Sequence, residues 1–273
     1  MVRTAIALAR SSHPGPAIAV TVVAVLLAAG VGATGGRVAL VGAVMLLDQV
    51  SVGLANDWID APRDAAVGRT DKPVARGEVS RRLAAGWAFG TAAASVLLSV
   101  PLGAAFVAVH AIVLLSAWGY DLGLKRTPAS VLPFVVSFGL LPSLATTALT
   151  PPQLAPAWAF VAGASLGIAA HVANVLPDLA ADAATGVRGM PHRIGRRTSI
   201  VVIAVATIAG AAAVALGARG PALVLGGPAA LIGVAILVLG LRRPPTRALF
   251  RLVIAAAIVD VSLLVLSGGA LVR

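Results

Sequence analysis

The sequence predicts an all-α membrane protein, and three observations support this fold class. Of the 273 residues, 59% are apolar and only 11% are charged, whereas soluble domains usually have about 25% charged residues. The mean hydropathy is +0.98, and the charges gather in short clusters between long apolar runs, a pattern typical of membrane topology. The chain has no cysteine, which excludes disulfides and thiolate metal sites.

Nine apolar runs approach the roughly 20 residues that a helix needs to cross the hydrocarbon core of a bilayer. The rest of the chain is too short for a separate soluble domain, so we expect a single polytopic domain over residues 1–273. The predicted spans are residues 15–34, 37–55, 83–100, 102–119, 129–149, 156–175, 198–217, 220–241 and 248–270.

The segments between the runs support this division. The first run follows Arg3 and Arg10, as in a signal peptide, but it is longer than a usual signal core and the second run follows at once, which indicates a retained helix. Short uncharged loops at residues 100–102 and 150–153 separate the third run from the fourth and the fifth from the sixth. Two prolines interrupt the fifth run, which makes it one of the weaker spans.

Basic residues set the predicted orientation, because Lys and Arg favour the cytoplasmic side. With a cytoplasmic N-terminus, 18 of the 21 Lys and Arg residues fall on that side, and only Arg37, Arg219 and Arg273 fall outside. An odd number of spans then places the C-terminus outside the plasma membrane. A net charge of +11 would suggest a nucleic-acid partner in a soluble protein, but here topology accounts for it, so we expect membrane lipid and no nucleic acid.

Six of the ten acidic residues lie in two segments, residues 56–71 and 174–182, each at the cytoplasmic end of a predicted span. The first acidic stripe consists of Asp57, Asp60 and Asp64, at positions i, i+3 and i+7. The second consists of Asn174, Asp178 and Asp182, at positions i, i+4 and i+8. On an α-helix each set lies along one face.

Like charges along one helix face repel one another, so a cation should compensate them. Carboxylates suit Mg²⁺, which usually binds through one or two carboxylates together with the phosphates of a substrate. Two facing stripes would hold Mg²⁺ around a diphosphate, and Arg or Lys side chains would bind the remaining phosphate oxygens. The alternative is that the acids are solvated loop residues that balance nearby Arg, and that the basic residues are topology signals alone.

Four His and Asp residues lie within predicted spans. His171 lies one turn before Asn174 on the same face, where it would orient an acceptor hydroxyl or accept a proton, or serve only in packing. His110 has no such alignment, which favours packing. Asp48 lies about two turns before the first acidic stripe and either lines a cavity or bonds a neighbouring helix, while Asp260 faces the bundle or a subunit contact.

These motifs resemble those of the UbiA superfamily of intramembrane prenyltransferases over essentially the whole chain. Asn56-Asp57-x-x-Asp60-x-x-x-Asp64, followed by Arg69 and Lys72-Pro73, resembles the first signature of the family. Tyr120 with Leu124-Lys125-Arg126 resembles its loop between the fourth and fifth helices. Asn174-x-x-x-Asp178-x-x-x-Asp182-x-x-x-Gly186, with Pro191 and Gly195, resembles the second signature.

The resemblance implies a ring of nine helices around a central cavity that opens to the cytoplasm and sideways to lipid. It implies metal ligands at Asp57, Asp60, Asp64, Asp178 and Asp182, which together with His171 are the predicted catalytic residues. It also implies diphosphate-binding residues at Asn56, Arg69, Lys72, Lys125, Arg126 and Asn174. The sequence departs from the pattern at Asn174, where many members carry Asp, and one carboxylate fewer weakens a third metal site.

The predicted function is Mg²⁺-dependent transfer of a prenyl group from a prenyl diphosphate to a lipid-soluble acceptor, an aromatic compound or quinone precursor. One alternative is a terpene cyclase or transfer to a non-aromatic acceptor at the same diphosphate site. Eleven aromatic residues are few for guiding a carbocation through several rearrangements, which favours simple transfer. A transporter or non-catalytic membrane protein is the alternative from another class, but transporters place their sites near the midplane and show repeats, whereas these acids lie at the rim.

Overall fold

The computed structural model describes residues 2–218, 222–242 and 247–272, without the side chains of residues 178, 180, 181, 184, 222–226, 229, 247–254 and 257. These residues form helices and no strand. The α-helices are α1 (Val2–Ser11), α2 (Pro14–Gly30), α3 (Gly35–Ala66), α4 (Arg81–Ser99), α5 (Ala104–Leu122), α6 (Leu132–Thr147), α7 (Ala157–Val175), α8 (Leu179–Ala184), α9 (Met190–Ala218), α10 (Ala222–Arg242), α11 (Arg247–Leu266) and α12 (Gly268–Leu271). Four short 3₁₀ helices connect some of them: η1 (Val100–Leu102), η2 (Leu124–Arg126), η3 (Pro128–Val131) and η4 (Leu176–Asp178).

The prediction of a multi-pass all-α membrane fold is confirmed, and every predicted span overlaps one long helix. Among the described residues, six helices are long and apolar enough to cross a membrane, and the bent pair of α1 and α2 raises the number to seven. The full number of nine spans stays a prediction.

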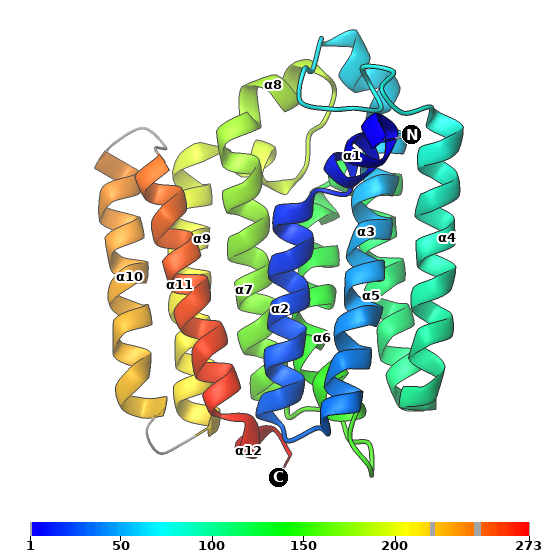
Figure 1. Cartoon of the computed structure of the whole chain (residues 1–273). Helices are drawn as coiled ribbons and strands as arrows, with labels where there is room; N and C mark the ends of the chain where they lie inside the picture. Colours follow the sequence, from blue (N-terminus) through cyan, green and yellow to red (C-terminus); the bar gives the residue numbers. More distant parts are fainter. Residues whose placement is uncertain (1, 219–221, 243–246, 273) are drawn as a thin grey trace.

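The long helices stand side by side (Figure 1), and most pack against their neighbours in the sequence. α3 contacts α2 and α4, and α7 contacts α6 and α9. α11 also contacts α2, so the last long helix packs against the first. Small residues allow the closest approaches: a Cβ atom at Gly163 or Gly167 of α7 would overlap the backbone carbonyl of Phe138 or Phe134 in α6, as is common between membrane helices.

The polar connections gather at one end of this bundle. α1, α8 and the connection from α3 to α4 lie at that end, whereas α12 lies at the opposite end (Figure 1). This arrangement agrees with termini on opposite sides of a membrane, as the charge pattern predicts. Which end faces the cytoplasm stays a prediction.

Candidate active site

The first acidic stripe lies on the polar end of α3. The predicted span ended at residue 55, but the helix continues to Ala66, so Asp57, Asp60 and Asp64 share one helix face as their spacing predicted. All three side chains are buried, with relative exposures of no more than 3%. Burial of three carboxylates is costly unless cations or hydrogen-bond donors compensate them.

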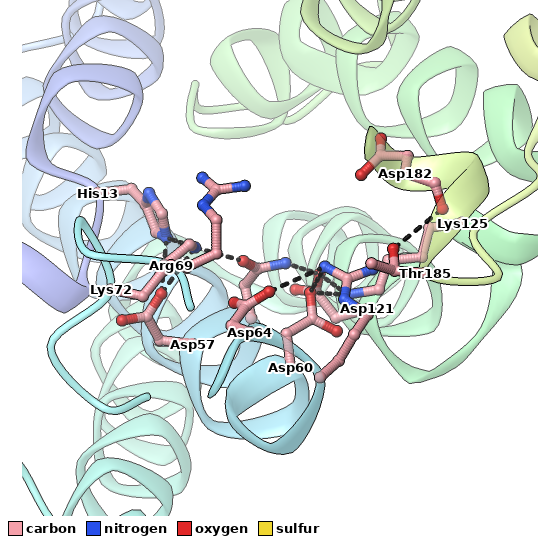
Figure 2. Close-up of polar contacts among 12 residues, drawn as sticks. His13, Asp57, Asp60, Asp64, Arg69, Lys72, Asp121, Lys125, Asp182 and Thr185 are labelled. Carbon is pink, nitrogen blue, oxygen red and sulfur yellow. Dashed lines mark hydrogen bonds and ion pairs between the residues drawn. The ribbon is translucent and has the colours of Figure 1, made fainter. Parts of the chain in front are cut away.

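Each of these carboxylates has a cationic partner on one of its oxygens. The Nζ atoms of Lys72 and Lys125 lie 2.7 Å from Asp57 Oδ1 and from Asp60 Oδ2, respectively. Arg63 lies 3.1 Å from Asp60 Oδ2 and 3.4 Å from Asp64 Oδ1. Figure 2 shows that Lys72 approaches from the connection between α3 and α4, so segments distant in the sequence meet at the stripe.

Asn56 and Asp121 join the two lysines into one network. Asn56 donates from Nδ2 to Asp121 Oδ1 at 2.7 Å and accepts from Lys72 Nζ at 3.2 Å. Asp121 is buried at the end of α5 and lies 3.5 Å from Lys125. The sequence analysis missed Asp121. Its position four residues before Lys125 could have indicated an ion pair between the two, because residues four apart are neighbours on a helical turn.

His13 is the second residue that the sequence analysis missed. Its Nε2 atom lies 2.9 Å from Lys72 Nζ and 3.2 Å from Asp57 Oδ1. No spacing in the sequence relates His13 to residues 57 and 72, because the contact depends on how α1 and α2 pack against α3.

The second acidic segment departs from the prediction of one continuous stripe. α7 ends at Val175, a 3₁₀ turn follows, and α8 begins at Leu179. Pro177 lies in the turn and lacks the N–H group that an unbroken α-helix requires there. Asn174, predicted to bind diphosphate, has an exposed side chain. The side chain of Asp178 lies outside the described residues.

Asp182 lies on α8, apart from Asp57, Asp60 and Asp64 of α3 (Figure 2). Its side chain is partly buried, with Oδ2 at 3.7 Å from His192 Nε2. Its backbone carbonyl accepts a hydrogen bond from Thr185 Oγ1 at 2.9 Å. The structure therefore places this carboxylate at the same end of the bundle as the first stripe, but on a separate element.

The two predicted arginines are placed differently from the two lysines. Arg69 donates from Nε and Nη2 to the carboxylate of Asp71 at 2.8 and 2.7 Å. These hydrogen bonds lower the pKa of Asp71 to about 2, so the pair is ionised throughout the neutral range. Arg126 is exposed on η2 and makes no polar side-chain contact with any other described residue.

His171 is buried next to an aromatic group formed by Tyr120 and Phe134. The centroids of their rings lie 5.8 and 4.7 Å from the centroid of the imidazole. Ser130 Oγ accepts from the backbone N–H of Met190 at 2.8 Å and lies 3.1 Å from His171 Nε2. The hydroxyl hydrogen of Ser130 is therefore free to donate to Nε2. Nδ1 of His171 has no partner among the described residues.

The donor set fits a hard divalent cation chemically. One carboxylate oxygen each on Asp57, Asp60 and Asp64 is buried without a hydrogen-bond partner among the described residues: Oδ2, Oδ1 and Oδ2, respectively. Oxygen ligands of this kind are those that Mg²⁺ prefers. Within the described part of the chain, however, no three His, Asp or Glu side chains converge on one preformed metal position. Any metal bound here therefore needs further oxygen ligands, such as substrate phosphates.

The remaining membrane-depth acids lie inside the bundle. Asp48 Oδ1 of α3 lies 3.3 Å from His110 Nε2 of α5, and both side chains are fully buried. This contact brings Asp48 beside a neighbouring helix, although neither of the two atoms makes a hydrogen bond among the described residues, and His110 has a polar neighbour that the sequence did not indicate. Asp260 is buried against Gly210 of α9, which places it toward the bundle.

Comparisons with known proteins agree with this fold. The sequence model of the UbiA prenyltransferase family matches residues 17–259. The digeranylgeranylglyceryl phosphate synthase of Methanopyrus kandleri is 30% identical over 155 residues, which are 56% of this chain and 56% of that protein. The chain thus matches little more than half the length of this curated relative.

Two solved structures of a UbiA homologue from Archaeoglobus fulgidus are similar to the whole chain. The one bound to GPP and Mg²⁺ has a TM-score of 0.72 at 16% identity and covers 97% of this chain and 99% of its own. The one bound to DMAPP and Mg²⁺ has a TM-score of 0.74 at 13% identity and covers 97% and 98%. At such identities the likeness shows the fold alone. The family match over residues 17–259 goes further and shows that this chain belongs to the UbiA prenyltransferase family.

Proposed function

We propose that this protein transfers a prenyl group from a prenyl diphosphate to a lipid-soluble acceptor in a reaction that requires Mg²⁺. The observation that carries the proposal is the buried acidic stripe on α3, in which each carboxylate has one oxygen paired with a cation and one without a hydrogen-bond partner among the described residues. Mg²⁺ would supply the positive charge that the unpartnered carboxylate oxygens need. The prenyl diphosphate would supply the further oxygen ligands that the metal needs. The ligands of the Archaeoglobus fulgidus homologue support this choice.

The residues of the chain divide between metal and phosphate. Asp57, Asp60 and Asp64 would hold Mg²⁺ on one side, with Asp182 and Asp178 from the second segment. The bound metal supplies charge neutralisation at the diphosphate leaving group.

Lys72, Lys125 and Arg69 would donate to phosphate oxygens that the metal leaves uncovered. The lysines suit this task because an ammonium has three donors and a flexible stem, so each can turn from its carboxylate to a phosphate. Arg126 and Asn174 belong to the same proposed set of diphosphate-binding residues. Because their side chains are exposed, they would reach the diphosphate from the solvent-facing side of the site.

The proposed reaction breaks the bond between C1 of the prenyl chain and the diphosphate oxygen, and the electron pair leaves with the diphosphate. A nucleophilic atom of the acceptor then bonds to C1 and loses its proton. Lysine and arginine donors stabilise the charge that develops on the leaving oxygen. His171 is the proposed group that orients the acceptor or takes this proton. Its Nδ1 has no partner among the described residues, in a ring that lies beside Tyr120 and Phe134. Taking the proton on Nδ1 requires the tautomer with the hydrogen on Nε2, which then donates to Ser130 Oγ.

Two acceptor classes fit the proposal. An aromatic compound or quinone precursor is the class that the sequence motifs predict. A glyceryl phosphate is the second candidate, because the curated relative is named as a digeranylgeranylglyceryl phosphate synthase.

Incubation of the purified protein with labelled prenyl diphosphates of several lengths, Mg²⁺ and a membrane extract tests the function. We expect a labelled lipid product and release of pyrophosphate, and the identity of the product distinguishes the two acceptor classes. Absence of both signals with every donor length would contradict the proposed function.

A further inference from the structure

The joint between α1 and α2 carries His13 to the first acidic stripe from outside the family match, which begins at residue 17. The two helices meet at an angle of 62°. His13 lies at this bend with φ 52° and ψ 63°, a left-handed conformation that few residues other than Gly adopt, although His, Asn and Asp adopt it more readily than most. Pro14 then begins α2, and its fixed φ suits the first helical position.

The imidazole of His13 closes a triangle with Lys72 and Asp57 (Figure 2). Nε2 lies 2.9 Å from Lys72 Nζ and 3.2 Å from Asp57 Oδ1, and Nζ lies 2.7 Å from that same oxygen. An ammonium group has donors only, so Nε2 accepts from Lys72 in the tautomer that carries its hydrogen on Nδ1, and in that tautomer it does not donate to Asp57 Oδ1. Lys72 then has three acceptors: the carboxylate of Asp57, the imidazole of His13 and the amide oxygen of Asn56 at 3.2 Å.

Packing fixes the position of this joint on α3. A Cβ atom at Gly53 would overlap the backbone carbonyl of Ser12. The backbone of the joint therefore lies in direct contact with the backbone of α3, one turn before the acidic stripe. On the other side of the joint, Ala7 of α1 is buried in a cluster with Val74 from the connection that carries Lys72. α1 thus ties the connection and the joint together, and His13 does not reach Lys72 by a flexible loop.

We propose that His13 is a positioning residue that keeps the Lys72 ammonium beside the diphosphate site when Asp57 turns its charge toward a metal ion. This inference rests on the proposed function. Without the imidazole, Lys72 would keep only the amide oxygen of Asn56, at 3.2 Å, once Asp57 binds metal, and its four-carbon stem would move more freely. Holding the donor in place before the diphosphate arrives lowers the ordering cost of binding.

Three variants test this role through the affinity for geranyl diphosphate in the presence of Mg²⁺, measured by titration calorimetry on detergent-purified protein. His13→Gly keeps the left-handed backbone and removes the imidazole. His13→Asn also tolerates that backbone and supplies an amide oxygen as acceptor. Arg10→Ala is the matched control on α1, because it removes only the exposed contact of Arg10 with Glu78.

We expect His13→Gly to raise the dissociation constant about tenfold, the size expected for a hydrogen bond to a charged group. We expect His13→Asn to recover most of the affinity and Arg10→Ala to match the wild type. Equal affinity of His13→Gly and the wild type would overturn the proposal, and so would equal losses in His13→Gly and His13→Asn, which would assign the effect to the joint.

A double variant separates positioning from general stability. In a Lys72→Met background the His13→Gly change should cause no further loss of affinity, because the ammonium group that His13 is proposed to hold is absent. A full additional loss would contradict the proposal.

A readout without any ligand separates this inference from the proposed function. Acetylation of Lys72, followed by mass spectrometry, should proceed severalfold faster in His13→Gly than in the wild type, and an unchanged rate would count against the His13–Lys72 contact. If the wild type fails to bind geranyl diphosphate with Mg²⁺, the proposed function fails, whereas the acetylation rate still tests the contact.

Discussion

At the scale of single residues, the site is built from carboxylates that each have one oxygen paired with a cation and one oxygen without a hydrogen-bond partner among the described residues. Asp60 shows this most clearly, because Oδ2 lies 2.7 Å from Lys125 while Oδ1 is buried without a partner among the described residues. Burying an ion pair costs desolvation energy that the attraction between its charges often only offsets, so pairing with Lys125 alone gives little reason to bury the charge of Asp60. The predictions for single residues therefore distinguish carboxylates that hold Mg²⁺ and diphosphate from carboxylates that only pair with Lys and Arg.

Asp60→Asn keeps the size of the side chain and removes one negative charge from the stripe. If the stripe holds Mg²⁺ and diphosphate, we expect prenyl transfer to fall about 10²–10³-fold, the cost of losing one element of electrostatic stabilisation in a transition state. The measurement is transfer by monodisperse protein in detergent. Glu78→Gln, which changes an acid that pairs with Arg10 and Arg76 away from the stripe, should retain normal rates, and near-normal turnover in Asp60→Asn would argue against the catalytic assignment.

Removal of divalent cations should abolish transfer and the release of pyrophosphate. The reason is that buried carboxylates and a diphosphate are both anionic and cannot approach each other without a cation between them. Activity is measured after chelation and again after Mg²⁺ is restored. Full turnover in excess chelator would exclude the metal from the reaction.

At the scale of elements, residue spacing predicted the arrangement of side chains correctly where a helix is continuous, and wrongly where it is broken. The spacing of Asp57, Asp60 and Asp64 predicted their common face, because α3 is one unbroken α-helix to Ala66. The same reasoning was wrong for the second segment, where Pro177 lies in a 3₁₀ turn. Periodicity reports only contacts within a helix, so it could not indicate contacts between elements, such as that of His13 with Lys72.

The Asp48–His110 contact belongs to this scale, because it links α3 to α5 within the apolar bundle. His110→Leu leaves a buried carboxyl group without its ring partner, and we expect a loss of about 3 kcal/mol in the free energy of unfolding. The measurement is unfolding by denaturant in detergent. The double variant Asp48→Leu with His110→Leu should be more stable than His110→Leu alone, since it removes both polar groups. Equal stability of the two variants would show that the carboxyl group of Asp48 costs nothing when His110 is absent, which would contradict this expectation.

At the scale of the whole molecule, the sequence predicted the all-α fold and its polar end, because hydropathy and charge are averaged over long segments. α1 and α12 lie at opposite ends of the bundle, as an odd number of crossings requires. The orientation in the membrane follows from the charge pattern alone and is open to direct measurement.

Reporter fusions test that orientation. A fusion after Arg126 or Arg197 should report the cytoplasm, and one near Pro152 or Arg273 should report the outside, because 18 of 21 basic residues fall on the cytoplasmic side. Activity of reporters at all four positions measures the topology. A cytoplasmic signal at residue 273 would remove one crossing from the predicted nine.

The ion pair between Asp60 and Lys125 joins residues that are 65 positions apart, and this distance has a consequence for biogenesis. When α3 leaves the ribosome and reaches the translocon, Lys125 has not been synthesised, so the carboxylate of Asp60 has only Arg63 as a nearby cation. Charged residues oppose the insertion of a helix into lipid. The ion pair therefore forms only after α5 has been synthesised, and the acidic end of α3 depends on this later segment for one of its cations.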